Sequence, residues 1–502
     1  MTNNQKTFVI VGGGTAGWLT ALLLRKNFPE NKITLIESSN IGILGAGEGT
    51  TPHFPEFLDE VEIDQIDFLK NTKATFKNGI KFTNWHGDGS YYFHPFGEGK
   101  FSLDNIPNEV VWHELVENKN FNNISITHLA AKQNKTLVYA DDSNNLERLG
   151  NHAYHFDARL TAEYFKKVSL TRNVNLVDGE VVEFLQEETG EITGLKLNDG
   201  SVVSCNFVFD CTGLHRQIID KVYKQEWCDY KESLPLNKAL PFFIKNDSEV
   251  IPPYTEAIAM KYGWVWKIPV QGRYGCGYVF DSRHITDEEA KQEILDVFGD
   301  VDMPRPQPFS FSAGCFRNTW VKNCVAIGLS TGFIEPLEAT SIWVSIMSLR
   351  ELFDEYKDSL FDDSCYGEAN KIAFNDYVYN LNIQIKDFIQ LHYMTERTDT
   401  EFWKHYKEKN LISNSVTAIR SSKSLKELQT ASKKFDLFTF HVAAGVKYYD
   451  SGIFENKISM SPMSKEEVEL NLKNYQNTIK LYSDFKFIDH YKLIDHLKQK
   501  VT

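Results

Sequence analysis

A glycine-rich turn close to the N-terminus constrains the fold of this chain more than any other feature. Thr7 to Val11 reads as a buried parallel strand, which is followed by Gly12-x-Gly14-x-x-Gly17 and a helical run to about Asn27. Ile33 to Glu37 reads as a second strand and completes a β-α-β unit. In such a unit the glycines allow a tight turn, a close approach of backbone to a pyrophosphate, and packing of the helix on the strand. We therefore expect an α/β fold with a Rossmann-type core that binds a dinucleotide.

Further features favour FAD as that dinucleotide. Glu37 ends the second strand about 20 residues after the glycine turn, where a carboxylate accepts hydrogen bonds from ribose hydroxyls. Asp210-Cys211-Thr212-Gly213 follows a late strand, as in FAD-dependent hydroxylases, and no second complete fingerprint for a nicotinamide cofactor is present. That absence suggests that reduced flavin comes from a separate reductase. The candidate cofactor contacts are Gly12, Gly14, Thr15, Ala16, Gly17, Glu37, Ala46, Gly47, Asp210, Gly213 and Gly328.

The pattern of the remaining chain changes from α/β to mainly helical. Residues His53 to Phe76 read as largely helical, and long amphipathic helices are expected at Ala369 to His392 and Ser464 to Phe487. We expect a core of residues 1–345 that binds FAD, resembles flavin monooxygenases and contains mixed β-sheets. Substrate-side β segments at about 77–150 and 227–320 interrupt this core, and residues 346–502 are expected to form a mainly helical substrate cap.

Composition and charge exclude several classes of protein. The net charge of −14 argues against nucleic acid or an anionic membrane as a partner. No run of about 18 apolar residues is present, so we expect no membrane span. The 7 cysteines are scattered without a Cys-x-x-Cys pair, which argues against a disulfide framework or a metal site and fits a cytoplasmic location.

Three distant segments, taken in order, resemble one family. The segments are Phe76-Lys77-x-x-x-Lys81-Phe82-x-Asn84-Trp85, Trp264-x-Trp266-x-Ile268-Pro269 and Glu335-Pro336-Leu337-Glu338. Together with the glycine turn they resemble the flavin-dependent halogenases of the tryptophan halogenase type. The resemblance runs from Gly12 to about Gly445.

The resemblance implies two catalytic side chains. Lys77 would be the catalytic lysine, which hydrogen-bonds hypohalous acid or, when deprotonated, forms a haloamine. Glu338, rather than Glu335, would polarise the halogen donor or take the proton from the ring. Without the resemblance, Lys77 reads as a solvated surface lysine and Glu338 as an acid that stabilises a helix N-terminus.

The resemblance also implies a halide site, a substrate site and a gate. Thr340 and Ser341 correspond to the halide site, although the tryptophan-specific members usually have Ser-Thr-Gly here. His94-Pro95-Phe96 would stack against the substrate ring, where a core histidine–phenylalanine pair is the simpler interpretation. Trp264 and Trp266 share one face of a strand and would separate the substrate from the flavin, so that the product is halogenated rather than hydroxylated.

Three other segments bear on the substrate. Gly47 to Pro52 resembles the family's loop between flavin and substrate, and we expect a mobile strap there. The stretch from Phe438 to Gly445 lacks the tyrosine pair with which tryptophan-specific members hold the amino acid, and Tyr448-Tyr449 is out of register. An indole or another electron-rich aromatic is therefore expected rather than free tryptophan. His392 is interpreted as a core histidine rather than a catalyst.

The resemblance thus implies a halogenase that uses reduced FAD, oxygen and a halide (bromide, chloride or iodide), with hypohalous acid handled by Lys77 and Glu338. Two alternatives remain open at this point. An FAD-dependent aromatic hydroxylase would give an oxygenated product without any need for halide. A non-catalytic protein that binds flavin or an aromatic ligand would give no turnover. No sequence feature decides whether the chain forms a homodimer.

Overall fold

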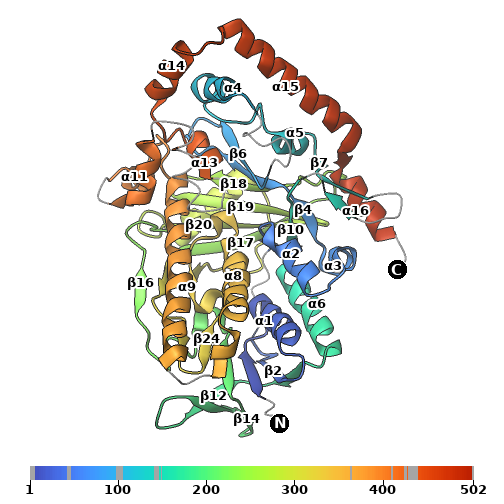
Figure 1. Cartoon of the computed structure of the whole chain (residues 1–502), viewed down its shortest axis with the longest axis vertical. Coiled ribbons are helices and arrows are strands. Elements are labelled where there is room, and N and C mark those ends of the chain that lie inside the picture. The colour runs from blue at the N-terminus through green and yellow to red at the C-terminus, as the bar shows by residue number, and fades with distance from the viewer. Residues whose placement is uncertain are drawn as a thin grey trace.

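The structure is a computed structural model that combines two large sheets with a helical C-terminal region (Figure 1). The strands β17 to β20 cross the middle of the molecule, and helices α14 and α15 arch over one end of it. The structure describes residues 6–41, 47–97, 106–140, 146–148, 150–361, 365–408, 411–422, 427 and 439–499.

The first large sheet contains the expected Rossmann-type unit. Strands β1 and β2 pair in parallel, and helix α1 (Thr15–Asn27) connects them and buries its apolar residues from Trp18 to Leu24. The only antiparallel pair among the described strands of this sheet joins β23 to β24. The strand order is β11 (Asn175–Asp178), β2 (Lys32–Glu37), β1 (Thr7–Val11), β15 (Phe207–Asp210), β24 (Cys324–Ala326) and β23 (Trp320–Val321).

The second large sheet forms a wall of the site described below. Its described strands pair antiparallel, except for the parallel pair of β5 and β18. The order is β21 (Phe309–Ser310), β17 (Lys238–Lys245), β20 (Arg273–Phe280), β19 (Gly263–Val270), β18 (Thr255–Ala259), β5 (Gly79–Thr83) and β6 (Tyr91–Pro95).

A small antiparallel sheet links the cofactor side to the substrate side. Strand β10 (Ala153–Asp157) pairs on one edge with β3 (Gly47–Gly49) and on the other with β4 (Thr75–Lys77). The expectation that His53–Phe76 is largely helical therefore holds for most of this range but not for its last residues. Helices α2 (His53–Glu60) and α3 (Gln65–Thr72) are present, but Lys73 takes a left-handed conformation with φ of 53° that ends α3, and the chain continues as β4.

Shorter sheets and helices complete the α/β part. Helix α7 begins with a capping box formed by Thr286 and Glu289, which satisfies backbone donors of its first turn. The further strands are β7 (Lys135–Thr136), β8 (Val138–Ala140), β9 (Leu146–Arg148), β12 (Val181–Gln186), β13 (Ile192–Leu197), β14 (Val202–Ser204), β16 (Trp227–Asp229), β22 (Gly314–Phe316) and β25 (Gly332–Phe333). The helices are α4 (Asn108–His113), α5 (Ile126–Lys132), α6 (Ala158–Thr171) and α7 (Asp287–Phe298).

The C-terminal third is mainly helical, as expected. The two long helices predicted from the sequence are α9 and α15, and α15 contacts α4 and α5 beneath it (Figure 1). No helix in the described part of the chain is long and apolar enough to cross a membrane. The elements are α8 (Thr340–Asp354), α9 (Cys365–His392), α10 (Glu401–His405), α11 (Asn414–Arg420), α13 (Thr439–Gly445), α14 (Ser451–Ser459), α15 (Lys465–Lys486), β26 (Ile488–Asp489) and α16 (His490–Gln499).

Candidate active site

The start of α1 has the shape of a phosphate cradle. Gly12 has a φ of +116°, and a Cβ on Gly17 would lie 1.9 Å from the Gly12 carbonyl oxygen, so neither position tolerates a side chain. The N-cap residue Gly14 has no side-chain cap, and a Cβ placed on it would meet nothing within 4 Å. Uncapped N–H groups, a positive helix end and free space fit a pyrophosphate.

Other predicted cofactor residues surround this turn. Glu37 forms an ion pair with Lys166. Gly328 approaches the first turn of α1 so closely that a Cβ there would lie 2.7 Å from the Ala16 Cβ. Gly213 has a φ of +63° and begins a short helical turn (Gly213–His215). Ala46 lies outside the described residues.

Asp210 has a different environment from the one expected of a cofactor ligand. Its buried carboxylate accepts hydrogen bonds from the backbone N–H groups of Ile218 and Ile219 at 2.8 and 3.0 Å. It also accepts from the hydroxyls of Thr212 and Ser330 at 2.6 and 3.2 Å. Because the protein's own donors occupy this carboxylate, its local effect is to fix the turn that follows β15.

Lys77 ends β4 and is fully buried rather than solvated. Its Nζ donates to the Thr50 carbonyl oxygen at 3.0 Å and lies 4.6 Å from the centre of the Phe96 ring. Burial lowers the pKa of Lys77 to about 7, although the charge of Glu338 acts in the opposite direction. The amine can therefore exist in either protonation state near neutral pH.

Glu338 lies in a short helical turn (Pro336–Glu338) directly before α8, and 2% of its surface is exposed. The His94 Nδ1 atom is 2.9 and 3.0 Å from its two carboxylate oxygens, and the His392 Nε2 atom is 2.7 Å from its Oε1. Burial alone would raise the pKa of Glu338, but the two histidines outweigh it and lower that pKa to about 2. The carboxylate is thus ionised at neutral pH and fixed from two sides.

The predicted substrate residues lie beside both catalytic candidates. His94 contacts Glu338, the Phe96 ring faces Lys77, and the His94 and Phe96 rings meet edge to face at 6.2 Å. Pro95, between them, is the last residue of β6 and is buried. The structure therefore brings together an amine, a carboxylate and two aromatic rings from β4, β6 and the turn before α8.

The expected strap is an ordered strand over the residues that the structure describes here. Gly47 to Gly49 pair with β10, and Thr50 exchanges hydrogen bonds with the backbone of Tyr154. A Cβ on Gly49 would lie 3.0 Å from the Lys77 Nζ and 3.6 Å from the Ala339 Cβ, so this glycine packs closely against Lys77 and the residue that follows Glu338. Residues 47–50 are thus hydrogen-bonded to β10 in this structure, and the mobility of this segment stays a prediction from the sequence.

The two gate tryptophans lie on β19, with ring centres 6.3 Å apart. Trp264 donates its indole N–H to Glu335 at 2.8 Å, and the Tyr393 hydroxyl donates to the same carboxylate oxygen. Burial raises the pKa of Glu335 to about 7, against the effect of these two donors. Trp266 covers Gly277 of the neighbouring strand, where a Cβ would lie 2.0 Å from its ring.

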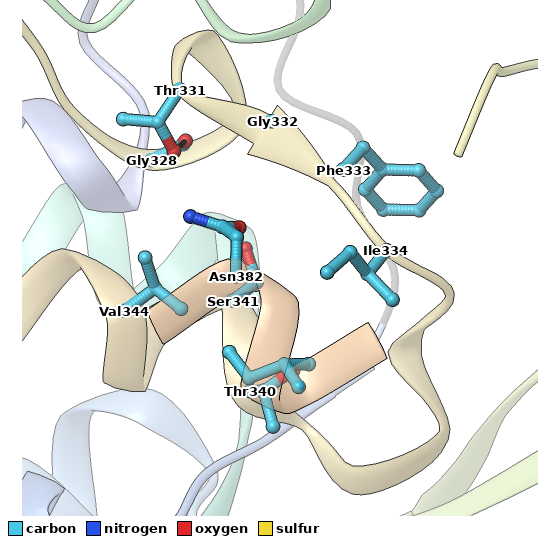
Figure 2. A pocket seen from close by; sticks show the side chains of 10 residues that line it. Gly328, Thr331, Gly332, Phe333, Ile334, Thr340, Ser341, Val344 and Asn382 are labelled. Carbon is cyan, nitrogen blue, oxygen red and sulfur yellow. Dashed lines mark hydrogen bonds between the residues drawn. The ribbon is translucent and has the colours of Figure 1, made fainter. Parts of the chain in front are cut away.

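A cavity of about 20 Å³ lies at the start of α8. Figure 2 shows the side chains of Thr331, Ser341 and Asn382 gathered around it, with Thr340 on the same turn of α8 as Ser341. Ala339, the N-cap of α8, has a left-handed φ of 57° and no side-chain cap, so it leaves first-turn N–H groups available. The two predicted halide residues and Gly328 thus line one small cavity, whose other walls include the apolar side chains of Phe333, Ile334 and Val344.

Several residues of this site were not predicted from the sequence. His392 was interpreted as a core histidine, yet it contacts Glu338 across 54 positions of sequence. Burial and the nearby His94 lower the pKa of His441 on α13 to about 3. Burial and Glu338 raise the pKa of Tyr92, which stacks on Phe82. Only the helical spacing from Phe388 to His392, at the inner end of α9, could have indicated that this histidine faces inward.

The comparisons with known proteins agree with this geometry. A family model described as "Tryptophan halogenase" matches residues 7–450. The chain is 32% identical over 436 residues to the tryptophan 6-halogenase ThaL of Streptomyces albogriseolus, covering 82% of this chain and 80% of the relative. It is also 32% identical over 438 residues to the tryptophan 7-halogenase RebH of Lentzea aerocolonigenes, with 82% and 80% covered.

Solved structures give the same result for the fold. BrvH, a flavin-dependent halogenase from Brevundimonas sp. BAL3, superposes with a TM-score of 0.82 at 27% identity, covering 98% of this chain and 99% of that chain. The tryptophan 6-halogenase SttH from Streptomyces toxytricini superposes with a TM-score of 0.84 at 26% identity, covering 98% and 99%. Both comparisons extend over the C-terminal helical region.

Proposed function

The chain belongs to the tryptophan halogenase family, and from this premise we propose that it halogenates an indole or another electron-rich aromatic, with Lys77 and Glu338 as its catalytic residues. One observation carries the proposal. Lys77 and Glu338 are both buried in one site, beside His94 and Phe96, although neither residue type is normally buried. Structural packing alone does not explain two buried ionisable groups whose pKa values are both strongly lowered at this place.

We propose that the cradle at α1 binds FAD. Gly12, Gly14 and Gly17 fit the pyrophosphate, and Glu37 would accept the ribose hydroxyls. When bound there, reduced FAD supplies the electrons that activate oxygen, and a separate flavin reductase would provide it. The further contacts that we propose are Thr15, Ala16, Ala46, Gly47, Gly213 and Gly328, with Asp210 shaping the turn before Gly213.

We propose a halide site in the cavity at the start of α8. The Thr340 and Ser341 backbone and hydroxyl groups offer donors at the positive end of a 15-residue helix, which favours an anion. This arrangement does not distinguish bromide from chloride or iodide, because all three are single-charged spheres that accept hydrogen bonds. Their relative rates in one reaction mixture would decide the preference.

The chain's own residues account for the proposed halogen transfer. Lys77 would hold hypohalous acid through a hydrogen bond or, as the neutral amine, carry the halogen itself. His94 and Phe96 would stack on the aromatic ring, and Glu338 would accept the proton that the ring loses. Trp264 and Trp266 would keep the substrate on the Lys77 side of β19, and residues 346–502 would cap it.

Product mass spectrometry tests this proposal. The reaction contains FAD, NADH, a flavin reductase, oxygen and either bromide or chloride, with indole, phenol and tryptophan as substrates. A bromine isotope doublet that disappears in Lys77→Ala and Glu338→Gln supports it, provided that both variants still bind FAD. An oxygenated product without halogen would favour the hydroxylase instead, and bound flavin without any product would favour a binding protein.

A further inference from the structure

His392 has hydrogen-bond partners that restrict where its protons can lie. Its Nδ1 atom is 2.9 Å from the Phe388 carbonyl oxygen, and its Nε2 atom is 2.7 Å from the Glu338 Oε1. The His392 side chain is fully buried, so no bulk water competes for either nitrogen. A carbonyl oxygen only accepts hydrogen bonds, and therefore Nδ1 carries a proton.

The second nitrogen then faces a carboxylate. If Nε2 were unprotonated, its lone pair would point at the Glu338 oxygen across 2.7 Å, and the two acceptors would repel each other. A proton must lie between them, on His392 or on Glu338. Because His94 also hydrogen-bonds the Glu338 carboxylate, the ionised form of Glu338 is favoured and the proton belongs on His392.

A second buried histidine provides an internal contrast. His490 also has its Nδ1 atom 2.9 Å from a carbonyl oxygen, that of Ile251. Its Nε2 atom, however, accepts a hydrogen bond from the Phe76 backbone N–H at 2.9 Å and so carries no proton. The two residues are both fully buried and differ mainly in what faces Nε2. Of these two histidines, only His392 is required to hold a second proton.

The surroundings of His392 favour a cation. It is the last residue of the 28-residue helix α9, whose negative end attracts a positive charge. The rings of Phe82 and Phe388 lie 4.8 and 4.9 Å from its imidazole. The other titratable groups that face this pair are His94 and Tyr92 from β6, Lys77 from β4 and His441 from α13.

We propose that His392 is a positioning residue that keeps one proton on Nε2 against Glu338, and that this shared proton is used during halogen transfer. The inference rests on the proposed function and deepens it. His392 acts through Glu338, which is the group that would meet the substrate. The interpretation of His392 as a core histidine is thereby extended to a role in the reaction.

The proposed halogen-transfer step balances in atoms, electrons and protons. The aromatic carbon forms a bond to halogen as the halogen–oxygen bond of hypohalous acid breaks, and the oxygen leaves with the bonding electrons. That oxygen takes the shared proton from the His392–Glu338 pair and departs as water. Glu338 then removes the ring proton, the C–H electron pair restores the aromatic ring, and His392 regains its proton. The sum is ArH + HOX → ArX + H₂O.

Nitrogen NMR of the resting protein tests the proton without any turnover. Protein labelled with ¹⁵N-histidine is assigned with the variants His392→Gln and His490→Phe. We expect both ring nitrogens of His392 to be protonated and those of His490 to show the neutral Nδ1–H form. In Glu338→Gln, His392 should lose the second proton. A neutral His392 spectrum in the unsubstituted protein, matching that of His490, would overturn the inference.

Kinetics test whether that proton is used. In His392→Gln the amide N–H₂ still donates to Glu338 but cannot release a proton, so kcat should fall by about 100-fold. KM should stay within about twofold. Bromination of ring-deuterated indole should show no primary isotope effect in the variant, because the step that slows is halogen transfer with protonation of the leaving oxygen, which precedes loss of the ring proton.

The outcomes separate the two proposals. An unchanged kcat in His392→Gln, or a fall accompanied by a primary isotope effect, would reject the use of the proton in halogen transfer while leaving the halogenase proposal in place. If the unsubstituted protein gave no brominated product from any substrate, the proposed function would fail, and the NMR result would still decide whether His392 holds the proton.

Discussion

Two buried ionisable residues, Lys77 and Glu338, show how strongly single positions are adapted to this site. An amine and a carboxylate lose hydration on burial, and each needs compensation from nearby groups. Glu338 has two histidine partners, whereas Lys77 has a carbonyl and an aromatic ring. The lysine is therefore the less well compensated group, and its lowered pKa reflects that difference.

Replacing Lys77 with an apolar residue should abolish activity and increase the stability of the protein. A pKa lowered from 10.5 to about 7 corresponds to about 5 kcal/mol of unfavourable burial of the charged form. Below pH 7 both the folded and the unfolded lysine are protonated, so the full cost is present. From pH 7 to 10.5 only the unfolded form keeps its proton, and the cost disappears.

Lys77→Met should therefore raise the free energy of unfolding by a few kcal/mol at pH 6, by less at pH 9, and abolish halogenation. Urea unfolding at both pH values measures this change. Lys81→Met is the control, because Lys81 pairs with Glu256 and is partly exposed. A Lys77→Met protein that is less stable than the wild type at pH 6 would contradict the account.

The two glutamates of the same turn should respond differently to amidation. The pKa of Glu335 is raised to about 7, so ionised Glu335 costs up to about 3 kcal/mol above pH 7 and nothing below pH 4.5. In Glu335→Gln the amide oxygen can still accept from Trp264 and Tyr393. We expect this variant to match the wild type at pH 5, to exceed its stability at pH 8, and to keep halogenation.

Glu338→Gln should differ from Glu335→Gln in both stability and activity. The pKa of Glu338 is lowered to about 2, so its stabilising effect is present above pH 4.5 and is lost as the pH falls towards 2. The variant should be less stable than the wild type at pH 7 and should not halogenate. Thermal unfolding and product formation, measured on both variants, check the pair. Equal behaviour of the two would show that the turn, rather than Glu338 itself, matters.

At the scale of elements, neighbouring strands fix the positions of the aromatic side chains. Trp266 on β19 lies directly opposite Gly277 on β20, and the indole occupies the space above that glycine. The pairing of a large ring with a position that lacks a side chain sets the orientation of the gate. A cross-strand pair of this kind cannot be read from either strand alone.

Gly277→Ala should disturb the gate. The new Cβ would lie 2.0 Å from the Trp266 ring, so the indole must move, at a cost of about 1–3 kcal/mol. We expect a lower Tm, a change in tryptophan fluorescence and more hydroxylated or unproductive turnover per product formed. An unchanged fluorescence spectrum and an unchanged product ratio would show that Trp266 does not depend on this glycine.

The sequence predicted elements with strong local signals and missed those that depend on distant partners. Strand β1 and helix α1 were predicted with bounds close to those that the structure has, because the glycine turn marks the end of the strand and the start of the helix. The start of strand β4 falls in a range that was expected to be largely helical, since three residues carry little periodicity and the pairing partner β10 lies about 80 positions away. The contact of His392 with Glu338 was missed for the same reason.

At the scale of the whole molecule, the last helix stabilises the strand of the catalytic lysine. His490, at the start of α16, accepts from the backbone N–H of Phe76, which directly precedes Lys77 and is 414 positions away in sequence. The same imidazole donates to Ile251. The helical region thus supports the core of the site as well as covering it, which local sequence patterns do not reveal.

His490→Phe should weaken the molecule and the site together. It leaves the buried Phe76 N–H and Ile251 carbonyl without partners, which costs about 2 kcal/mol. We expect a lower Tm and slower halogenation, because β4 is no longer held. His496→Phe, at an exposed position of the same helix, is the matched control. Full halogenation in a destabilised His490→Phe protein would show that halogenation does not depend on the contact between α16 and β4.

The two lysines of one motif, Lys77 and Lys81, allow a direct test of the catalytic role proposed for Lys77. Bromination of indole is measured with reduced FAD and bromide for the wild type, Lys77→Met and Lys81→Met, with FAD affinity measured in parallel. We expect that all three bind FAD, that Lys81→Met brominates at nearly the wild-type rate, and that Lys77→Met gives no brominated product. Bromination by Lys77→Met at the wild-type rate would contradict that role.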